Sequence, residues 1–338
     1  MNAGTSYSVK EMFFWTLPDT IKIVLWASIP TIMFLCGIKW LVLPLELVSM
    51  VGVATSFIVG FRNSATYDRT WEARKIWGGI VNTSRSFAIS INDFLHYNSN
   101  LNELEIAQAK KEIIYRHFAW LTALRHQLRV SKDWEAMRLP HNKAYQEKYY
   151  KVREWEVSML EELKPYLTEN ELQQLNTKGN KASFLLSLQS NQLKDLLNSK
   201  NIDLFHQIDL QNRLYELYDH QGKSERIKNF PYPRQYTSIS KYLVKIFVFI
   251  LPFGLIGKFN IDTAYSSLYL LAAIPASSLI MWIFNTLERV GESSENPFEG
   301  AANDIPITNM SLNIENDCRD ILGLERIEIP VSDSKIIM

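Results

Sequence analysis

Apolar residues are concentrated near the two ends of the chain, and polar residues fill its middle. Residues 23–61 contain only two charged side chains, Lys39 and Glu46. Because about 20 apolar helical residues cross a bilayer core, this length predicts two membrane-spanning helices. We place the hairpin between them near Lys39, Pro44 and Glu46.

A second apolar pair lies toward the C-terminus. Tyr242–Ile256 forms a short span that holds Lys245, whose ammonium can reach the interface. Residues 257–262 are predicted to turn, and Tyr265–Leu287 is a span without any charged residue. An even number of spans puts both termini on the same side of the membrane as the polar middle.

The segment after the second span sets the orientation. Residues 62–85 carry five basic and two acidic side chains: Arg62, Arg69, Arg74, Lys75 and Arg85, with Asp68 and Glu72. Basic residues favour the cytoplasmic side of a membrane. We therefore expect a multi-pass protein with both termini in the cytoplasm.

The polar middle has a helical pattern, with apolar residues at three- and four-residue spacing. Thr168 and Glu171 have the spacing of a capping box at the start of a helix. The predicted helices are Ala107–Arg129, Trp134–Leu163, Ser183–Leu197 and Leu204–Tyr218. The sequence predicts an all-α fold divided into residues 1–86, 87–235, 236–290 and 291–338: a first membrane pair, a cytosolic helical domain, a second membrane pair, and a C-terminal belt and tail.

Composition argues against several functions. Lys and Arg number 36 and so do Asp and Glu, so no nucleic acid partner is predicted. The chain has no Walker, GxGxxG or HExxH motif, and Cys36 and Cys318 lie far apart. We predict no enzyme activity, no cofactor and no disulfide.

Val53, Phe57 and Phe61 follow one another at spacings of four in the second span, so they share one face of a helix. Such a face either packs against a neighbouring helix or forms a constriction in a pore. Asp68 and Glu72, which follow, belong either to a solvated surface or to the wall of a chamber below the membrane.

Three long segments resemble the bacterial branch of the bestrophin ion channels. They are FRNSATYDRTWEARKIWGGIVNTSR at 61–85, GKSERIKNFPYPRQY at 222–236, and ERVGESSENPFEGAANDIPI at 288–307. The resemblance covers about residues 12–90 and 200–325. It implies a homopentamer in the bacterial inner membrane, with four transmembrane helices per subunit around one central pore.

The resemblance also implies roles for single residues. It places a hydrophobic neck at Val53, Phe57 and Phe61, and a helical vestibule below it. A second, cytosolic aperture falls at Phe205, with Ile202 as the alternative. The charged residues that the resemblance places in the vestibule wall are Asp68, Arg69 and Glu72.

Asn296-Pro297-Phe298 resembles the place where animal bestrophins hold calcium, which needs about six to eight oxygen ligands. The acids that follow are reduced here to Glu299 and Asp304. No metal site is predicted, although two carboxylates can bind calcium weakly at millimolar concentration.

The expected function is passage of monovalent ions, with chloride and other anions preferred. The edges of Phe57 and Phe61 are electropositive, and Arg62 lies one residue further along. If Asp68 and Glu72 face the axis instead, the alternative is a sodium or potassium channel of the same architecture. A hypothesis of a different class is a membrane-anchored helical scaffold or enzyme. The expected partners are other copies of the chain, membrane lipid and the permeating ions.

Overall fold

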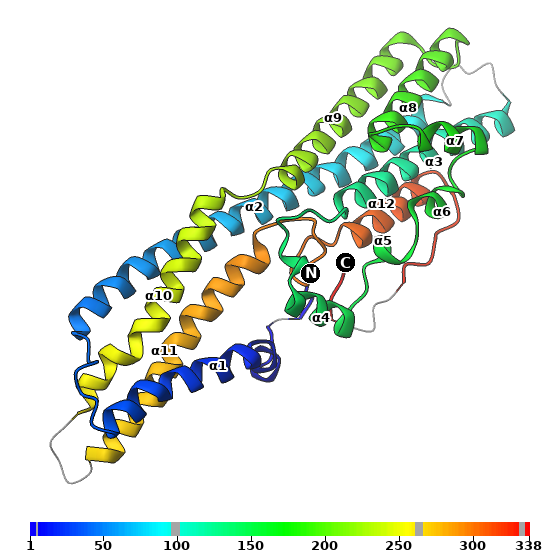
Figure 1. Cartoon of the computed structure of the whole chain (residues 1–338). Helices are drawn as coiled ribbons and strands as arrows, with labels where there is room; N and C mark the ends of the chain where they lie inside the picture. Colours follow the sequence, from blue (N-terminus) through cyan, green and yellow to red (C-terminus); the bar gives the residue numbers. More distant parts are fainter. Residues whose placement is uncertain (5, 96–101, 261–265, 331–334) are drawn as a thin grey trace. The chain divides into compact units, whose positions relative to one another are not determined.

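The computed structural model describes residues 1–4, 6–95, 102–260, 266–330 and 335–338 (Figure 1). Across these ranges the chain is almost entirely helical, and the one extended pairing described is a single bridge between Asn2 and Ile336. The predicted all-α class is confirmed.

The chain divides into two compact units. The membrane unit comprises Gly4–Arg69 and Pro231–Glu295, and the polar unit comprises Met1–Ala3, Thr70–Phe230 and Asn296–Met338. These divisions fall at residues 69, 230 and 295, whereas the sequence analysis placed its domain limits at 86, 235 and 290. Helix α2 is continuous and contributes to both units.

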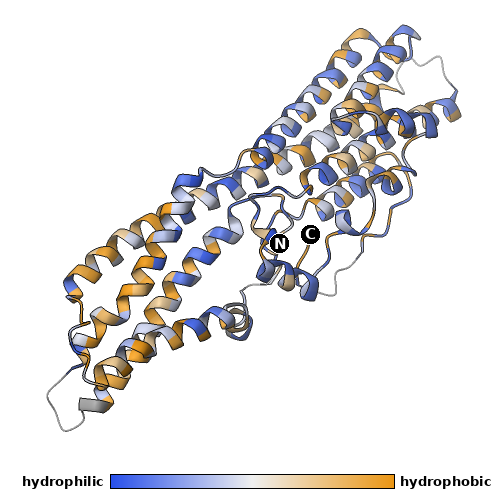
Figure 2. Cartoon of the chain, in the orientation of Figure 1, coloured by the Kyte–Doolittle hydropathy of each residue, from blue (hydrophilic) through white to orange (hydrophobic). Residues whose placement is uncertain are grey.

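Four helices are long and apolar enough to cross a membrane, as predicted. They are α1 (Val9–Leu35), α2 (Leu45–Phe94), α10 (Arg234–Phe259) and α11 (Ser266–Ser294). In Figure 2 the hydrophobic colour dominates α1, α10, α11 and the first part of α2.

The ends of these helices differ in detail from the prediction. Glu46 lies in the first turn of α2, because the hairpin is completed by residues 36–44. The turn predicted at 257–262 begins later, because α10 continues to Phe259; residues 261 and 262 lie outside the described residues.

The polar unit contains several long helices and a series of short ones. Besides the second part of α2, it consists of α3 (Glu103–Leu128), η1 (Ala136–Arg138), α4 (Pro140–Tyr149), α5 (Arg153–Glu156), α6 (Met159–Leu163), α7 (Glu169–Asn176), α8 (Lys181–Asn198), α9 (Leu204–Asn229) and α12 (Ile307–Ile321). The capping box of Thr168 and Glu171 begins α7, as predicted.

The single helix predicted over Trp134–Leu163 is wrong. Pro140 starts α4, where its missing N–H costs nothing, and extended residues at Tyr150 and Val157 separate α4, α5 and α6. The spacing of apolar residues is helical within each piece, so the pattern did not reveal the breaks.

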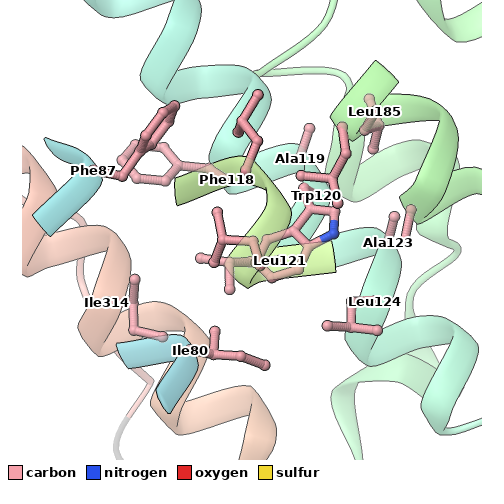
Figure 3. Close-up of a cluster of buried hydrophobic side chains, with 14 of the residues drawn as sticks. Ile80, Phe87, Phe118, Ala119, Trp120, Leu121, Ala123, Leu124, Leu185 and Ile314 are labelled. Atoms are coloured by element: carbon pink, nitrogen blue, oxygen red, sulfur yellow. The ribbon is translucent and has the colours of Figure 1, made fainter. Parts of the chain in front are cut away.

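An apolar core fills the centre of the polar unit (Figure 3). Trp120 and Phe118 from α3 are fully buried with Phe87 from α2, Leu185 from α8 and Ile314 from α12. The indole N–H of Trp120 donates to Gln221 of α9 at 2.9 Å, which satisfies its polar atom within the core.

Candidate functional site

Within the membrane unit, α2 has two faces of opposite exposure. Val48, Thr55, Val59 and Thr66 are buried on one face. The other face, which we call the exposed stripe, consists of Glu46, Met50, Val53, Phe57, Phe61, Ser64 and Asp68. Spacings of three and four residues keep these side chains in line along the helix.

The three residues predicted to form a neck lie together on the exposed stripe. Val53, Phe57 and Phe61 are 70%, 66% and 62% exposed, although they are large and apolar. The rings of Phe57 and Phe61 meet edge to face, with centroids 4.9 Å apart and planes at 78°. Burial of such side chains is normally favourable by about 2 to 3 kcal/mol each. In the single chain this face therefore lacks a partner surface that would bury it.

Arg62 lies on the buried face of α2, although it follows Phe61 directly. Its guanidinium is 2% exposed and forms an ion pair with Glu288 of α11 and another, at 2.7 Å, with Glu295. The hydroxyl of Ser240 donates to Glu288 at 2.7 Å, and Arg234 binds Glu295 at 3.0 Å. The charge of Arg62 is therefore matched within the subunit.

Arg69 is also turned away from the exposed stripe. Its Nε donates to the backbone carbonyl of Glu295 at 3.2 Å, so it helps to attach α2 to the end of α11. Asn63 contributes to the same attachment by donating to the Leu287 carbonyl at 3.1 Å. A side chain at Gly291 would meet the Asn63 side-chain oxygen at 2.2 Å, so it would displace the Asn63 amide from its present place.

The two predicted acidic residues differ in their surroundings. Asp68 is exposed on the stripe, and among the described residues no ion-pair partner is found for it. Glu72 lies in the polar unit, where its carboxylate binds the ammonium of Lys75 at 2.8 Å. Of the charges expected in a vestibule wall, only Asp68 belongs to the exposed stripe.

Comparison with known proteins identifies the family. The sequence profile described as "Bacterial/Fungal Bestrophin protein" matches residues 13–320, which is most of the chain. The chain belongs to the bacterial and fungal bestrophin family.

Other bestrophin relatives are similar over most of their length. A voltage-dependent anion channel-forming protein of Ralstonia nicotianae is 28% identical over 280 residues, covering 81% of this chain and 76% of that protein. The voltage-dependent anion channel-forming protein YneE of Escherichia coli is 28% identical over 281 residues, covering 83% and 77%. The crystal structure of a bacterial bestrophin homologue from Klebsiella pneumoniae matches with a TM-score of 0.75 at 24% identity, covering 91% of this chain and 99% of that one. The fold is therefore that of a bestrophin, as the resemblance predicted.

The two residues considered for a cytosolic aperture have opposite surroundings in this bestrophin chain. Ile202 is 3% exposed and belongs to the core of the polar unit. Phe205, in the first turn of α9, is 81% exposed. The side chain of Ile202 therefore has no access to an ion path without rearrangement of that core.

Glu299 and Asp304, the acidic pair after the Asn296-Pro297-Phe298 segment, are buried and make contacts within the polar unit. Asp304 binds the Arg129 guanidinium at 2.7 Å and accepts the backbone N–H groups of Phe298, Gly300 and Ile305. Across the described residues no group of three or more His, Cys, Asp or Glu side chains is placed to hold a metal ion.

Glu299 is buried beside Asp304 and Glu135. Burial first, and then these two carboxylates, raise its pKa well above the usual range, although the Met137 N–H and the Lys228 ammonium oppose the shift. Asp304 is engaged by Arg129 and by three backbone N–H groups, and Glu299 is buried, so neither acid of the pair is exposed as a calcium ligand.

Sequence reasoning missed the partners of Arg62. Glu288 and Glu295 lie seven residues apart, which places them on one face at the end of α11. An arginine next to an apolar span requires a counter-charge, so this spacing was an available signal. Sequence reasoning also placed Glu46 in the hairpin and did not recognise that it shares a helix face with Met50, Val53 and Phe57.

Proposed function

We propose that this bestrophin is a homopentameric ion channel of the bacterial cytoplasmic membrane that passes monovalent ions, with anions preferred. In this proposal Val53, Phe57 and Phe61 of five subunits form the neck of one central pore. The observation that carries the proposal is the exposed stripe of α2, an apolar face left open by a helix whose opposite face is packed. The anion preference is supported by the names of the Ralstonia and Escherichia relatives.

Small residues beside the stripe favour contact between identical helices. Gly60 is exposed, and a side chain added there would meet nothing within 4 Å. Ala54 and Ser56 are exposed on the same half of the helix. Small residues let membrane helices approach closely, and closed cyclic symmetry arranges identical helices around an axis.

The neck would act by excluding water. A narrow apolar constriction gates by dewetting, so an ion passes only when water wets the ring of side chains. The edges of aromatic rings carry partial positive charge, which favours anions as they lose hydration water. Below the neck, the polar unit would form a cytosolic vestibule, and the exposure of Phe205 favours it over Ile202 as a second aperture.

A cation channel of the same architecture is the second candidate, because two observations favour it. Asp68 is the exposed charge at the end of the stripe, and five copies would form a ring that attracts cations. Arg62 is compensated by Glu288 and Glu295, which removes the positive charge expected below the neck.

Two measurements test the proposal. The mass of the detergent-purified protein should correspond to five subunits, and a monomer or dimer would contradict the channel. After reconstitution, the reversal potential in a sodium chloride gradient should take the sign for chloride. A sodium-selective potential that Asp68→Asn abolishes would favour the cation channel instead.

The neck is tested by shortening its side chains. Phe57→Ala and Phe61→Ala should raise open probability or conductance, because a wider and less apolar ring is wetted more easily. Leu25→Ala is the matched control, since Leu25 is 64% exposed on α1 and away from the stripe. Unchanged currents in both phenylalanine variants and in the triple variant with Val53→Ala would rule out this neck.

A further inference from the structure

The exposed stripe of α2 begins with a charged residue. Glu46 lies in the first turn of the helix, and its side chain is 77% exposed. Met50 and Val53 follow it at four and seven residues, so the carboxylate stands in line with the predicted neck. If the stripe lines a pore, five copies of Glu46 surround the entrance on the side of the α1–α2 hairpin.

A cation from another helix accompanies this carboxylate. Lys258, in the last turn of α10, places its ammonium 3.6 Å from a Glu46 oxygen, and its side chain is 61% exposed. Solvent screens an exposed ion pair strongly, so this pair does little to hold the helices together. Its main effect is on the electrostatic potential in the water around it.

The place of Lys258 is set by close packing that does not involve its charge. A side chain at Gly254 would lie 2.7 Å from Val48 of α2, and one at Gly257 would lie 2.9 Å from Val42. The Leu43 N–H donates to the Phe253 carbonyl at 3.0 Å, which ties the hairpin to α10. Lys258 therefore remains beside the start of α2 whether or not its ion pair is formed.

We infer that Glu46 and Lys258 together set the concentration of permeating ions at the hairpin-side entrance of the pore. The inference rests on the proposed channel. Glu46 repels anions and attracts cations, and Lys258 offsets this charge, so the two residues act on the current in opposite directions. The effect applies to ions that enter from the hairpin side, because entry from the other side is governed by other charges.

Neutralising each residue in turn provides the test. In single-channel recordings at 0.1 M sodium chloride, Glu46→Gln should raise the anion current that enters from the hairpin side about threefold, and Lys258→Gln should lower it about threefold. Both changes should largely disappear at 1 M salt, where the Debye length falls from about 10 Å to about 3 Å. If cations carry the current, both signs reverse and the opposition between the variants remains.

Lys39→Gln is the matched control. Lys39 lies in the same hairpin but outside α2, and its ammonium is 5.7 Å from the centroid of the Phe34 ring of α1. Neutralising it should leave the current–voltage relation unchanged. A change as large as that of Lys258→Gln would overturn the specific role of the pair.

The outcomes separate this inference from the proposed function. A wild-type protein that carries no ion current contradicts the channel itself. Wild-type currents with both variants unchanged, or with both shifted in the same direction, overturn the inference and leave the channel standing.

Chemical modification adds a second measurement. In a Cys36→Ser background, which removes an exposed native thiol, Glu46→Cys can be modified from the hairpin side. A negatively charged thiol reagent should restore the wild-type current, and a positively charged one should raise the anion current beyond that of Glu46→Gln. Equal effects of the two reagents would argue against an electrostatic role.

Discussion

The two compact units differ in how much apolar surface they bury. At the centre of the polar unit are aromatic and aliphatic residues such as Phe118 and Trp120, which are almost wholly buried. In the membrane unit, Arg62 is held between two glutamates near the end of that unit's part of α2, while large apolar side chains such as Leu25 and Phe57 are exposed. Both units contain buried ion pairs, but among the described residues the apolar core of the polar unit is far larger than the apolar clusters of the membrane unit.

This difference identifies what stabilises each unit. The polar unit removes apolar surface from water by itself, so the hydrophobic effect acts within one chain. The membrane unit leaves much of its apolar surface exposed, and in the proposed channel lipid or further copies of the chain would cover it. Lipid tails are as apolar as the side chains themselves, so moving a side chain from lipid into the protein gains no hydrophobic free energy. Close packing and polar contacts then hold the helices together.

The largest expected effect comes from removing the buried positive charge of Arg62 in the membrane unit. Arg62→Met removes the ion pair of the buried Glu288 and leaves Glu295 paired with Arg234, and it should lower stability by about 3 to 5 kcal/mol. Thermal unfolding of the detergent-purified protein measures this loss. Arg85→Met is the control, because its ion pair with Asp317 is exposed and should contribute at most about 1 kcal/mol. Equal losses in the two variants would show that the buried ion pairs of Arg62 stabilise the protein no more than the exposed pair of Arg85.

A second pair of variants compares phenylalanines in the two units. Phe118→Ala creates a cavity in the core of the polar unit and should cost about 3 to 5 kcal/mol. Phe57→Ala removes an exposed ring and should cost less than about 1 kcal/mol while raising the ion current. Unfolding curves and bilayer recordings of both proteins separate the two effects. A large loss of stability in Phe57→Ala would mean that this ring is packed rather than open to a pore.

A smaller, pH-dependent effect is expected from Glu299 in the polar unit. Because folding raises the pKa of Glu299, the folded state binds this proton more tightly than the unfolded state, whose glutamate pKa is about 4.3. The contribution of this proton to the free energy of unfolding is fully present below the unfolded pKa and is lost as the pH rises toward the raised pKa of the folded state. The loss is at most about 1.4 kcal/mol per pH unit. Glu299→Gln should flatten this fall in unfolding measurements between pH 5 and 9. The exposed Glu147→Gln should not, and a wild-type profile in Glu299→Gln would contradict the assignment.

The smallest expected effect is that of calcium. Channel activity with chelator on both sides should equal that in micromolar calcium, because Asp304 is already bound by Arg129 and by backbone N–H groups. Single-channel recording in the two solutions is the measurement. Activity that vanishes in chelator and returns with micromolar calcium would show that backbone carbonyls complete a site in the absence of free carboxylates.

Features with local signals were predictable from the sequence. The length of the apolar runs predicted four spans, and Thr168 with Glu171 predicted the start of α7. The four-residue spacing of Val53, Phe57 and Phe61 predicted a shared helix face, and the three do share an exposed one. That this face lines a pore remains a prediction.

Features that depend on distant contacts were not predictable in this way. Ile202 and Phe205 are both apolar and lie three residues apart, and only the packing around the start of α9 buries one and exposes the other. The hydrogen bond from Arg69 to the Glu295 carbonyl joins residues that are 226 positions apart, so no local pattern in the sequence indicated it. Periodicity shows which side chains share a face, but it does not show which neighbour that face meets.

The pairing of Arg62 also has a consequence for the order of synthesis. Its nearest partner, Glu288, lies 226 residues further along the chain. At about 5 to 20 residues per second, the ribosome needs about 10 to 45 s to reach it. During that time α2 is already made while Glu288 is missing, so we expect the nascent helix to keep Arg62 in polar surroundings such as the lipid headgroups. We expect the second span to reach its final depth only after the fourth has been translated.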